Sequence, residues 1–506
     1  MNGCRSRQRW MRDVSALILT LLLSACAARA AGPLFGADKT GDPLATLQRE
    51  LAALFAASTV DHVQWGIRFH SVRSNETLYS LNASRFMVPA SNQKLLTAAV
   101  AAERLGWDYR FTTRLLATAP PNHDGIIEGD LIVVSNGDPT INPRHPDRWD
   151  AFDRWAAALK ARGIRAIQGR LLGDDNAFAE PAFGVGWAWD NLQYGYGTPP
   201  SGLQYNENQV EVIVMPGIAT GGRAIIATSP PGSGLVIDNQ VTTVAASEET
   251  FVDIARVAGA KSLTVRGQVA AQARPVSITA SIDNPTSFYL NALREALWRQ
   301  DIVFTHGSVD LDALEEPPSP DRMTELLVDA SPPLSEIIDV TMKWSRNIYA
   351  ETLLLATAPP GEPATGARGL RSMRETLAAW GIESDAYLPR DGSGLSRYDY
   401  VSADVLTRLL LHLWNTPKHA RAYESTLPVA GVSGSLATRM RGTPAEGRVR
   451  AKTGTLSNVR SLSGYLTTVD GDTVAFAMLA NNFRVSTSEI DAIMEAALNR
   501  VVQSAR

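Results

Sequence analysis

Cysteine is almost absent from this chain of 506 residues, and the two that occur, Cys4 and Cys26, lie near its beginning. The rest of the chain can therefore hold no disulfide and no thiol nucleophile. A fold without disulfides depends on its hydrophobic core, and a hydrophobic content of 45% over this length is enough to build one. Blocks of basic residues are also missing and the net charge is −4, so we expect no nucleic-acid partner.

Two common site signatures are missing as well. The seven histidines show no H-x-x-x-H or Cys/His spacing, so the sequence predicts no metal site. There is no G-x-S-x-G pattern, which disfavours an α/β-hydrolase, and Gly392-Ser393-Gly394 is more typical of a turn than of a nucleophile. We expect neither a metal nor an organic cofactor.

The first 31 residues have the pattern of an export signal. Four arginines precede an apolar segment, residues 14–23, which is too short to span a bilayer as a stable helix. Two processing sites then compete. ARA (28–30) resembles a small-x-small cleavage site, which makes residues 1–30 a signal peptide. LSAC (23–26) resembles a bacterial lipobox, which would remove residues 1–25 and attach a lipid anchor for the membrane at Cys26. The remaining alternative is a buried N-terminal helix.

Hydrophobic periodicity predicts a mixture of helices and strands. Apolar positions from Leu95 to Leu105 follow a helical repeat that ends at Gly106, and SerThrSerGlu at 486–489 offers a capping box for a last helix to about Val502. Strand-like runs dominate residues 164–282. We also expect strands at 62–72, 77–80 and 128–134, a hairpin around residues 470–472, helices at 147–162, 334–343 and 348–356, a loop at 361–369 and a linker at 315–321.

Three short motifs carry residues suited to acyl transfer. In PASNQKLLTA (89–98), Ser91 and Lys94 share a helix face, so a lysine of lowered pKa could activate the hydroxyl. In KTGT (452–455), the ammonium and hydroxyl can hold a carboxylate, and the glycine lets a substrate approach the backbone. In SRN (345–347), a hydroxyl and a carboxamide meet at a helix junction. Each motif alone is more typical of a cap, a turn or a common tripeptide.

The three motifs occur together, in the order that serine β-lactamases and penicillin-binding proteins share. The chain resembles the D-alanyl-D-alanine carboxypeptidase/endopeptidase family, the class C low-molecular-mass penicillin-binding proteins, which have a long insertion between the first two motifs. The resemblance covers residues 60 to 480. Further stretches that carry it are GDLIVVSNGDPT (129–140), GWAWDN (186–191), YGTPPSGL (196–203), KWSRNIYAETLL (343–354), DGSGLSRYD (391–399), LPVAGVSGSL (427–436) and KTGTLSNVRSLSGYL (452–466).

The resemblance implies roles for individual residues. Ser91 would be the acylated nucleophile and Lys94 its base. Ser345 and Asn347 would relay a proton and bind the peptide amide. Lys452 and Thr453 would hold the terminal carboxylate. The strand residues Gly454 and Thr455 would line the substrate, and the backbone N–H groups of Ser91 and Thr455 would form the oxyanion hole.

The resemblance also implies contacts to the substrate's side chain. Arg397 resembles a substrate-contact arginine of the family. The acidic residue with which the family recognises a diaminopimelate amine falls on Asn191 here, with Asp190 beside it, so this role is in question. Ser457 stands where some relatives carry a longer amide.

The resemblance predicts an α/β fold of the α+β type. We expect a β-lactamase/transpeptidase-like domain, an antiparallel sheet between helices, built from residues 32–113 and 319–506. A large, mainly β insertion, two subdomains at 114–318, would separate its halves. Tryptophans 149, 155, 187 and 189 could form a sugar platform, but core packing is the expectation.

The implied function is that of an exported, periplasmic serine DD-peptidase acting on peptidoglycan stem peptides. It would hydrolyse D-Ala-D-Ala, or cross-links to diaminopimelate, through an acyl-enzyme, and β-lactams would inhibit it by acylating the same serine. One alternative is a β-lactamase or esterase of the same superfamily. The other is a wall-binding scaffold without activity, against which the co-occurrence of all three motifs argues.

Overall fold

The computed structural model describes residues 42–505 except 58, 59, 61, 146, 147, 181, 258, 259, 261 and 319–322. The predicted export signal and Cys26 therefore lie outside the described residues. The chain divides into two compact units between Thr46 and Leu47. Of the first unit, residues 42–46 are described, and they begin helix α2 (Pro43–Phe55); all that follows concerns the second unit. No helix in the described ranges is long and apolar enough to cross a membrane.

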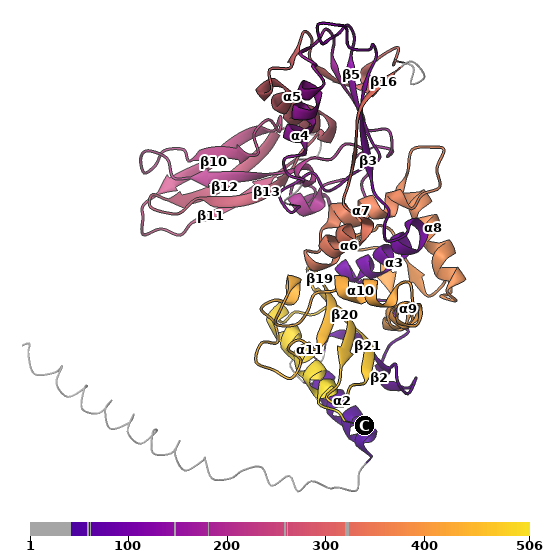
Figure 1. Ribbon diagram of the computed structural model, residues 1–506. Coiled ribbons are helices and arrows are strands. Elements are labelled where there is room, and N and C mark those ends of the chain that lie inside the picture. The colour runs from indigo at the N-terminus through magenta and orange to yellow at the C-terminus, as the bar shows by residue number, and fades with distance from the viewer. Residues whose placement is uncertain are drawn as a thin grey trace, which may run out of the picture. The chain divides into compact units, whose positions relative to one another are not determined.

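An antiparallel five-stranded sheet joins the two ends of this unit (Figure 1). Its strand order is β19-β20-β21-β1-β2. Strands β1 (Gln64–Ser71) and β2 (Thr77–Leu81) confirm the predicted N-terminal strands. Strands β20 (Val459–Thr467) and β21 (Thr473–Asn481) form the predicted hairpin, and β19 (Val449–Leu456) carries the KTGT motif.

Helices cover this sheet because its strands are apolar on both faces. On β21, Ala475, Ala477 and Leu479 belong to the same core as α9 (Ala403–Asn415), while Phe476 and Met478 are buried on the opposite face. Helix α11 (Thr487–Val502) packs along β20 and starts at the predicted capping box. The other helices that share the core with α9 are α3 (Gln93–Leu105), α6 (Leu334–Lys343), α7 (Asn347–Ala356), α8 (Gly366–Ala379) and α10 (Ala420–Thr426).

Helices α6 and α7 confirm the helices predicted at 334–343 and 348–356. The loop predicted at 361–369 is shorter in the structure. Helix α8 already begins at Gly366, because the Thr365 hydroxyl accepts a hydrogen bond from the Arg368 N–H and caps the helix.

A second five-stranded sheet has the order β15-β7-β5-β3-β16. Its core includes Trp155 and Leu159 of α4 (Ala151–Ala161), which lies within the predicted helix at 147–162, and Leu293 of α5 (Pro285–Arg299). The boundaries at 113/114 and 318/319 stay a prediction, although β3 and β16 pair with each other from either side of that range. The strands are β3 (Thr112–Ala117), β5 (Leu131–Ser135), β7 (Leu171–Asp174), β15 (Ser308–Asp310) and β16 (Thr324–Ala330).

Three smaller sheets complete the region between the first two motifs. Strand orders are β10-β12-β11, β13-β8-β9 and β14-β6-β4, and residues of the first two share a separate hydrophobic cluster that includes Val212 and Val265. The strands are β4 (Ile126–Ile127), β6 (Ala166–Ile167), β8 (Gln209–Met215), β9 (Ile225–Ser229), β10 (Val236–Val244), β11 (Phe251–Ala255), β12 (Ser262–Ala270), β13 (Val276–Ser281) and β14 (Val303–Phe304). The fold is thus the mixed α+β arrangement expected.

The tryptophans divide into buried and exposed ones. Trp155 is 2% exposed and belongs to the core, as expected. Trp149 and Trp189 are 61% and 70% exposed, so the expectation of core packing is wrong for these two.

We expect Trp155→Ala to lower the free energy of unfolding by about 3–5 kcal/mol, because it removes a large buried side chain and leaves a cavity beneath α4. Urea unfolding followed by circular dichroism measures the change. The exposed Trp149 is the matched control, and Trp149→Ala should stay within about 0.5 kcal/mol of the parent. Equal shifts in the two variants would contradict the assignment of Trp155 to the core.

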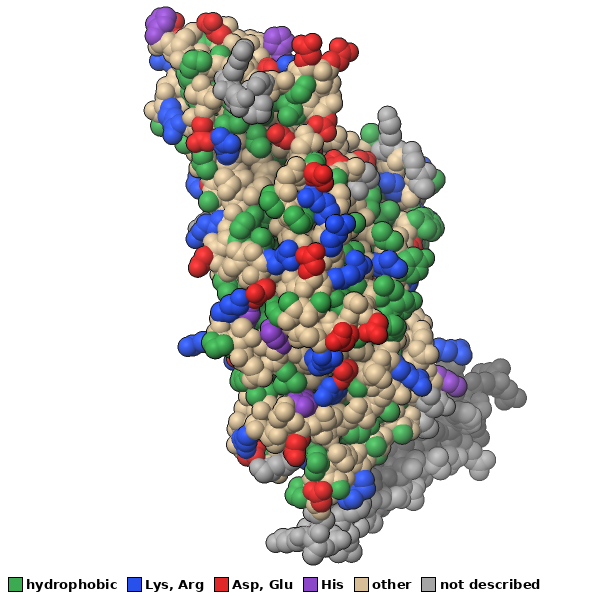
Figure 2. Space-filling model, turned by 90° about the vertical axis from the view of Figure 1, so that its right-hand side faces the viewer, with side chains coloured by type: hydrophobic (Ala, Val, Ile, Leu, Met, Phe, Trp, Pro, Cys, Tyr) green, Lys and Arg blue, Asp and Glu red, His purple; other side chains and the backbone are tan. Residues whose placement is uncertain are grey.

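Charged side chains are mixed by sign on the face of the molecule shown in Figure 2. Lys and Arg lie there among acidic and hydrophobic side chains, without a continuous basic stripe in the coloured, described part of this face. A basic stripe of that kind is the electrostatic footprint of nucleic-acid binding. This face therefore adds nothing in favour of such a partner.

Candidate active site

Ser91 and Lys94 meet at the start of α3, as the S-x-x-K spacing predicted. Ser91 lies in a 3-10 turn, Ala90–Asn92, just before the helix, and Lys94 is completely buried in its first turn. The Lys94 Nζ lies 2.9 Å from the Ser91 Oγ, 2.7 Å from the Asn347 Oδ1 and 2.7 Å from the Ser393 carbonyl oxygen. The amine therefore joins the first two motifs and the DGSGLSRYD stretch at one point.

Burial lowers the pKa of Lys94 to about 8, and the nearby carboxylates of Asp391, Glu351 and Asp399 oppose this shift. A buried ammonium has lost its hydration, so the neutral amine gains stability relative to the charged form. Near neutral pH a useful fraction of Lys94 can then accept a proton from Ser91.

Three buried carboxyl groups, those of Glu351, Asp391 and Asp399, hold the loop behind Lys94 by accepting hydrogen bonds from its backbone N–H groups. Glu351 of α7 accepts hydrogen bonds from the backbone N–H groups of Gly392 and Ser393. Asp391 accepts from the N–H groups of Gly394 and Ser396. These bonds fix the loop whose Ser393 carbonyl faces Lys94.

Two carboxyl groups of this cluster have raised pKa values. Burial and the charge of Asp391 raise the pKa of Glu351 to about 8. Burial and Asp391 also raise the pKa of Asp399 well above its usual range.

The second and third motifs are joined by a lysine. The Lys452 Nζ donates to the Ser345 Oγ at 2.8 Å and to the Thr453 carbonyl oxygen at 2.9 Å. Burial lowers the pKa of Lys452 well below its usual range, and Lys94 and Arg460 lower it further. The Thr453 Oγ1 lies 2.8 Å from the Ser435 Oγ. No carboxylate of the described residues is among the groups that shift the pKa of Lys452, so a carboxylate bound beside it would favour its charged form.

Two residues of the site motifs or next to them have a strained backbone conformation. Ala90 has φ 47° and Ser345 has φ 56°, a left-handed conformation that residues with a Cβ rarely adopt. Such strain is commonly held at functional sites by the surrounding structure.

Gly454 lets β19 lie against the nucleophile turn. A Cβ at this position would lie 2.9 Å from both the Ser91 nitrogen and the Pro89 carbonyl oxygen, and 2.2 Å from the Ser461 Oγ. The KTGT motif predicts that this glycine lets a substrate approach the backbone. The structure shows that the protein's own turn already needs the space.

A cavity of about 380 Å³ opens over these groups. The Arg397 Nη2 donates to the Ser457 carbonyl oxygen at 2.7 Å, and the Asn347 Nδ2 donates to the Tyr196 carbonyl oxygen at 2.8 Å. Asp190 is exposed and is not part of this wall. The lining residues are Ser91, Asn191, Tyr196, Ser345, Asn347, Gly394, Leu395, Arg397, Thr455, Leu456 and Ser457.

Sequence reasoning left four contributors to this site without a role. They are Glu351, Ser393, Ser435 and Tyr196, whose contacts are given above. All four lie in stretches that carried the family resemblance. Nothing in their local pattern, however, indicates a buried carboxylate or a carbonyl directed at a lysine.

One acidic cluster in the described part of the chain has ligand atoms close enough to hold a cation. The carboxylates of Asp175, Asp310 and Asp312 lie within 4.8 Å of one another. Asp175 accepts a hydrogen bond from the Thr286 hydroxyl, and Asp312 accepts one from the Asn176 amide. These partners account for two of the three groups without an ion, so we assign no metal here.

Comparisons with known proteins place this chain in a family. Residues 47–503 match the D-Ala-D-Ala carboxypeptidase 3 (S13) family. The D-alanyl-D-alanine carboxypeptidase of Actinomadura sp. (strain R39) is 33% identical over 461 residues, which are 88% of this chain and 82% of that protein. The D-alanyl-D-alanine carboxypeptidase DacB of Haemophilus influenzae is 28% identical over 426 residues, 83% of this chain and 85% of that protein.

A solved structure shares the fold. The crystal structure of penicillin binding protein 4 (dacB) from Haemophilus influenzae superposes with a TM-score of 0.78 at 24% identity, covering 90% of this chain and 99% of that one. The resemblance drawn from the motifs is thereby confirmed. The chain belongs to the D-Ala-D-Ala carboxypeptidase 3 (S13) family, and it is a serine-type peptidase.

Proposed function

We propose that the protein is a serine DD-peptidase that cleaves peptidoglycan stem peptides through an acyl-enzyme on Ser91. The observation that carries the proposal is the Lys94 amine, which is completely buried, has a lowered pKa and lies 2.9 Å from the Ser91 Oγ. A base of this kind beside a hydroxyl is the arrangement of an activated nucleophile. The relatives named above support the substrate class.

Acylation would begin when the Ser91 Oγ attacks the carbonyl carbon between the two D-alanines and gives its proton to the Lys94 Nζ. The N–H groups of Ser91 and Thr455 would stabilise the oxyanion. The C–N bond then breaks, and the proton held by Lys94 passes to the leaving amine by way of Ser345, which receives a hydrogen bond from Lys452, so that Lys94 is neutral again. The products are an ester on Ser91 and free D-alanine, or the freed amine of a cross-link.

Deacylation would repeat these steps with water as the nucleophile. Lys94 takes a proton from a water molecule, the hydroxide attacks the ester carbonyl, and the C–O bond to Ser91 breaks with the proton returned to its oxygen. Dividing one difficult hydrolysis in two is the general benefit of covalent catalysis.

Substrate recognition would use both ends of the cavity. Lys452 and Thr453 would hold the terminal carboxylate, with Thr453 fixed by Ser435. Arg397 and Asn191 would contact the side chain of the stem peptide. Because Asn191 is neutral and Asp190 is exposed outside the wall, we propose weak selection for a free amine there.

Export, the choice between ARA cleavage and lipidation at Cys26, and inhibition by β-lactams belong to this proposal. A β-lactam would be opened by Ser91 and would remain as an ester. In the alternative β-lactamase reading that ester would be hydrolysed rapidly, and in the scaffold reading it would not form.

The test is to incubate the mature protein with fluorescent penicillin, measure its intact mass and map the labelled peptide. A stable adduct on the Ser91 peptide, missing in Ser91→Ala, would support the proposal. Penicillin consumed without an adduct would favour the β-lactamase reading, and neither adduct nor consumption would favour the scaffold. Cross-linked and uncross-linked stem peptides would then separate endopeptidase from carboxypeptidase activity.

We expect Glu351→Gln to slow acylation about 10-fold and to move the midpoint of its pH dependence downward. Glu351 itself has a pKa raised to about 8, and in its ionised form it raises the pKa of Lys94, so losing that charge leaves more of the amine neutral at pH 8 and above. The new amide N–H₂ group would also face the N–H donors of Gly392 and Ser393. Penicillin labelling between pH 6 and 9 measures both effects. Glu375→Gln, on the exposed side of α8, is the control, and an unchanged midpoint in Glu351→Gln would contradict the coupling.

A further inference from the structure

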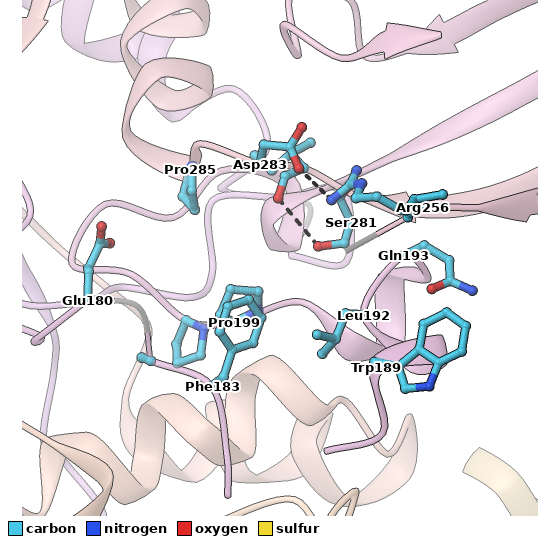
Figure 3. Close-up of a pocket in the computed structure, with 14 residues that line it drawn as sticks. Glu180, Phe183, Trp189, Leu192, Gln193, Pro199, Arg256, Ser281, Asp283 and Pro285 are labelled. Carbon is cyan, nitrogen blue, oxygen red and sulfur yellow. Dashed lines mark hydrogen bonds and ion pairs between the residues drawn. The ribbon is translucent and has the colours of Figure 1, made fainter. Parts of the chain in front are cut away.

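A second cavity, of about 340 Å³, lies on the other side of the segment that borders the active site. Figure 3 shows Phe183, Leu192 and Pro199 along one side of it, Trp189 and Gln193 at one end, and Arg256, Ser281 and Asp283 along the opposite side. The mechanism proposed above uses none of these residues. The cavity has an apolar floor and a few polar groups at its edge, which is the usual composition of a small-molecule site.

Two polar atoms in this wall have no hydrogen-bond partner among the described residues. The Gln193 side chain is 6% exposed, its Oε1 accepts no hydrogen bond, and Figure 3 shows that oxygen turned toward the interior of the pocket. The Arg256 Nε donates none, although its Nη1 pairs with the Asp283 Oδ1 at 2.5 Å and its Nη2 donates to the Ser281 carbonyl oxygen at 2.9 Å. An unpaired buried polar atom destabilises the protein, and a ligand with a matching donor or acceptor would remove this cost.

Aromatic rings at the cavity are left open to solvent. Trp189 is 70% exposed and Phe183 is 45% exposed. Core packing explains neither ring. A pyranose has an apolar face of C–H groups and a rim of hydroxyls, so it matches an aromatic ring beside the Arg256–Asp283 pair. The Gln193 Oε1 is an unpaired acceptor, and the N–H of the acetamido group of an N-acetylated sugar could donate to it.

The two cavities share one wall. In the 3-10 turn Trp189–Asn191, Trp189 lines this cavity and Asn191 lines the cavity over Ser91. Further along, Tyr196 lines the active-site cavity and Pro199 this one. Residues two positions apart can be separated by at most about 7 Å between their Cα atoms. The two cavities are therefore close enough that one ligand with a peptide arm and a sugar could reach both.

We propose that this cavity binds an N-acetylated sugar of the glycan strand that carries the stem peptide, an inference that rests on the proposed function. The sugar ring lies against Trp189, its acetamido N–H donates to Gln193, and its hydroxyls bond to Arg256 and Asp283. Binding of this remote part of the substrate helps to position the peptide over Ser91.

The direct test uses two soluble sugars that differ in the acetamido group. Chitotetraose, a β-1,4 tetramer of N-acetylglucosamine, should bind the mature protein in isothermal titration calorimetry, and cellotetraose, the glucose tetramer, should bind at least 10-fold more weakly. Trp189→Ala and Gln193→Leu should each weaken chitotetraose binding at least 10-fold, whereas Trp149→Ala, at another exposed tryptophan, should not change it. No binding by the parent protein, or equal binding by Trp189→Ala, would overturn the proposal.

A kinetic test separates this proposal from the proposed function. Trp189→Ala should lower kcat/KM at least 10-fold more for a glycan-linked stem peptide than for the free peptide. If Ser91 is labelled by penicillin and the ratio of the two kcat/KM values does not change, the sugar site is wrong and the peptidase function stands. If Ser91 is not labelled but chitotetraose binding depends on Trp189 and Gln193, the sugar site stands and the peptidase function is wrong.

Discussion

A Lys94→Met variant should be acylated by penicillin about 10³-fold more slowly than the parent protein at pH 8. Methionine fills a similar buried volume but cannot accept the proton of the Ser91 hydroxyl, which lies 2.9 Å from the Lys94 Nζ. General base catalysis typically contributes 10²- to 10⁴-fold. The labelling rate constant, measured by quenching at timed intervals, gives the result, with Ser91→Ala as the unlabelled baseline.

The pH dependence gives the same prediction a second readout. The parent's acylation rate should rise as the pH passes through about 8, since the neutral amine is the base and it accumulates above that pKa. The residual rate of Lys94→Met should be flat across this range. Lys160→Met removes a half-exposed lysine and should keep the parent's profile. A parent rate independent of pH between 6 and 9 would exclude Lys94 as the base.

Losing Lys94 also leaves the Asn347 Oδ1 and the Ser393 carbonyl without this donor. The melting temperature of the variant must therefore be checked. A folded variant labelled within threefold of the parent rate would contradict the assignment.

We expect Gly454→Ala to slow acylation about 100-fold while the protein still folds. The new methyl group would lie 2.9 Å from the Ser91 nitrogen and the Pro89 carbonyl oxygen, so β19 and the nucleophile turn must separate. The oxyanion donors proposed at Ser91 and Thr455 lie on these two elements. Removing one such donor from an active site typically costs 10²- to 10³-fold in kcat.

Labelling kinetics and the melting temperature together test this prediction. Gly307→Ala is the matched control, because a Cβ at Gly307 meets no atom within 4 Å. A folded Gly454→Ala variant that is acylated at the parent rate would show that the turn can move without loss of the site.

The sequence predicted the meeting of the three motifs because each carries a chemical signature at short range. S-x-x-K, S-x-N and K-T-G are recognisable within a few residues, and the structure joins them through Lys94 and Lys452. The strands and helices around them also follow strong local patterns, such as the capping box at Ser486 and Glu489.

The groups that support the site could not be predicted in the same way. Glu351 lies on an apolar helix, and its partners Gly392 and Ser393 come from a loop far along the chain. Burial of a carboxyl group is a property of the folded packing and leaves no periodic mark. Likewise, the contact of Gly454 with the turn at Pro89 depends on how β19 packs in three dimensions.

The pairing of β1 with β21 sets an order of assembly for the active enzyme. Gln64 pairs with Asn481 and Ser71 with Val474, so the central ladder of this sheet joins nearly opposite ends of the described chain. Contacts so distant in sequence are slow to form, since loop closure must precede them. The nucleophile turn follows β1 and the KTGT strand precedes the last hairpin, so the pairing of β1 with β21 helps to hold these two parts of the site together. A chain truncated before β21 would therefore retain Ser91 and Lys94 but lack the central ladder that ties β1 to the C-terminal strands, so we expect such a fragment to be inactive.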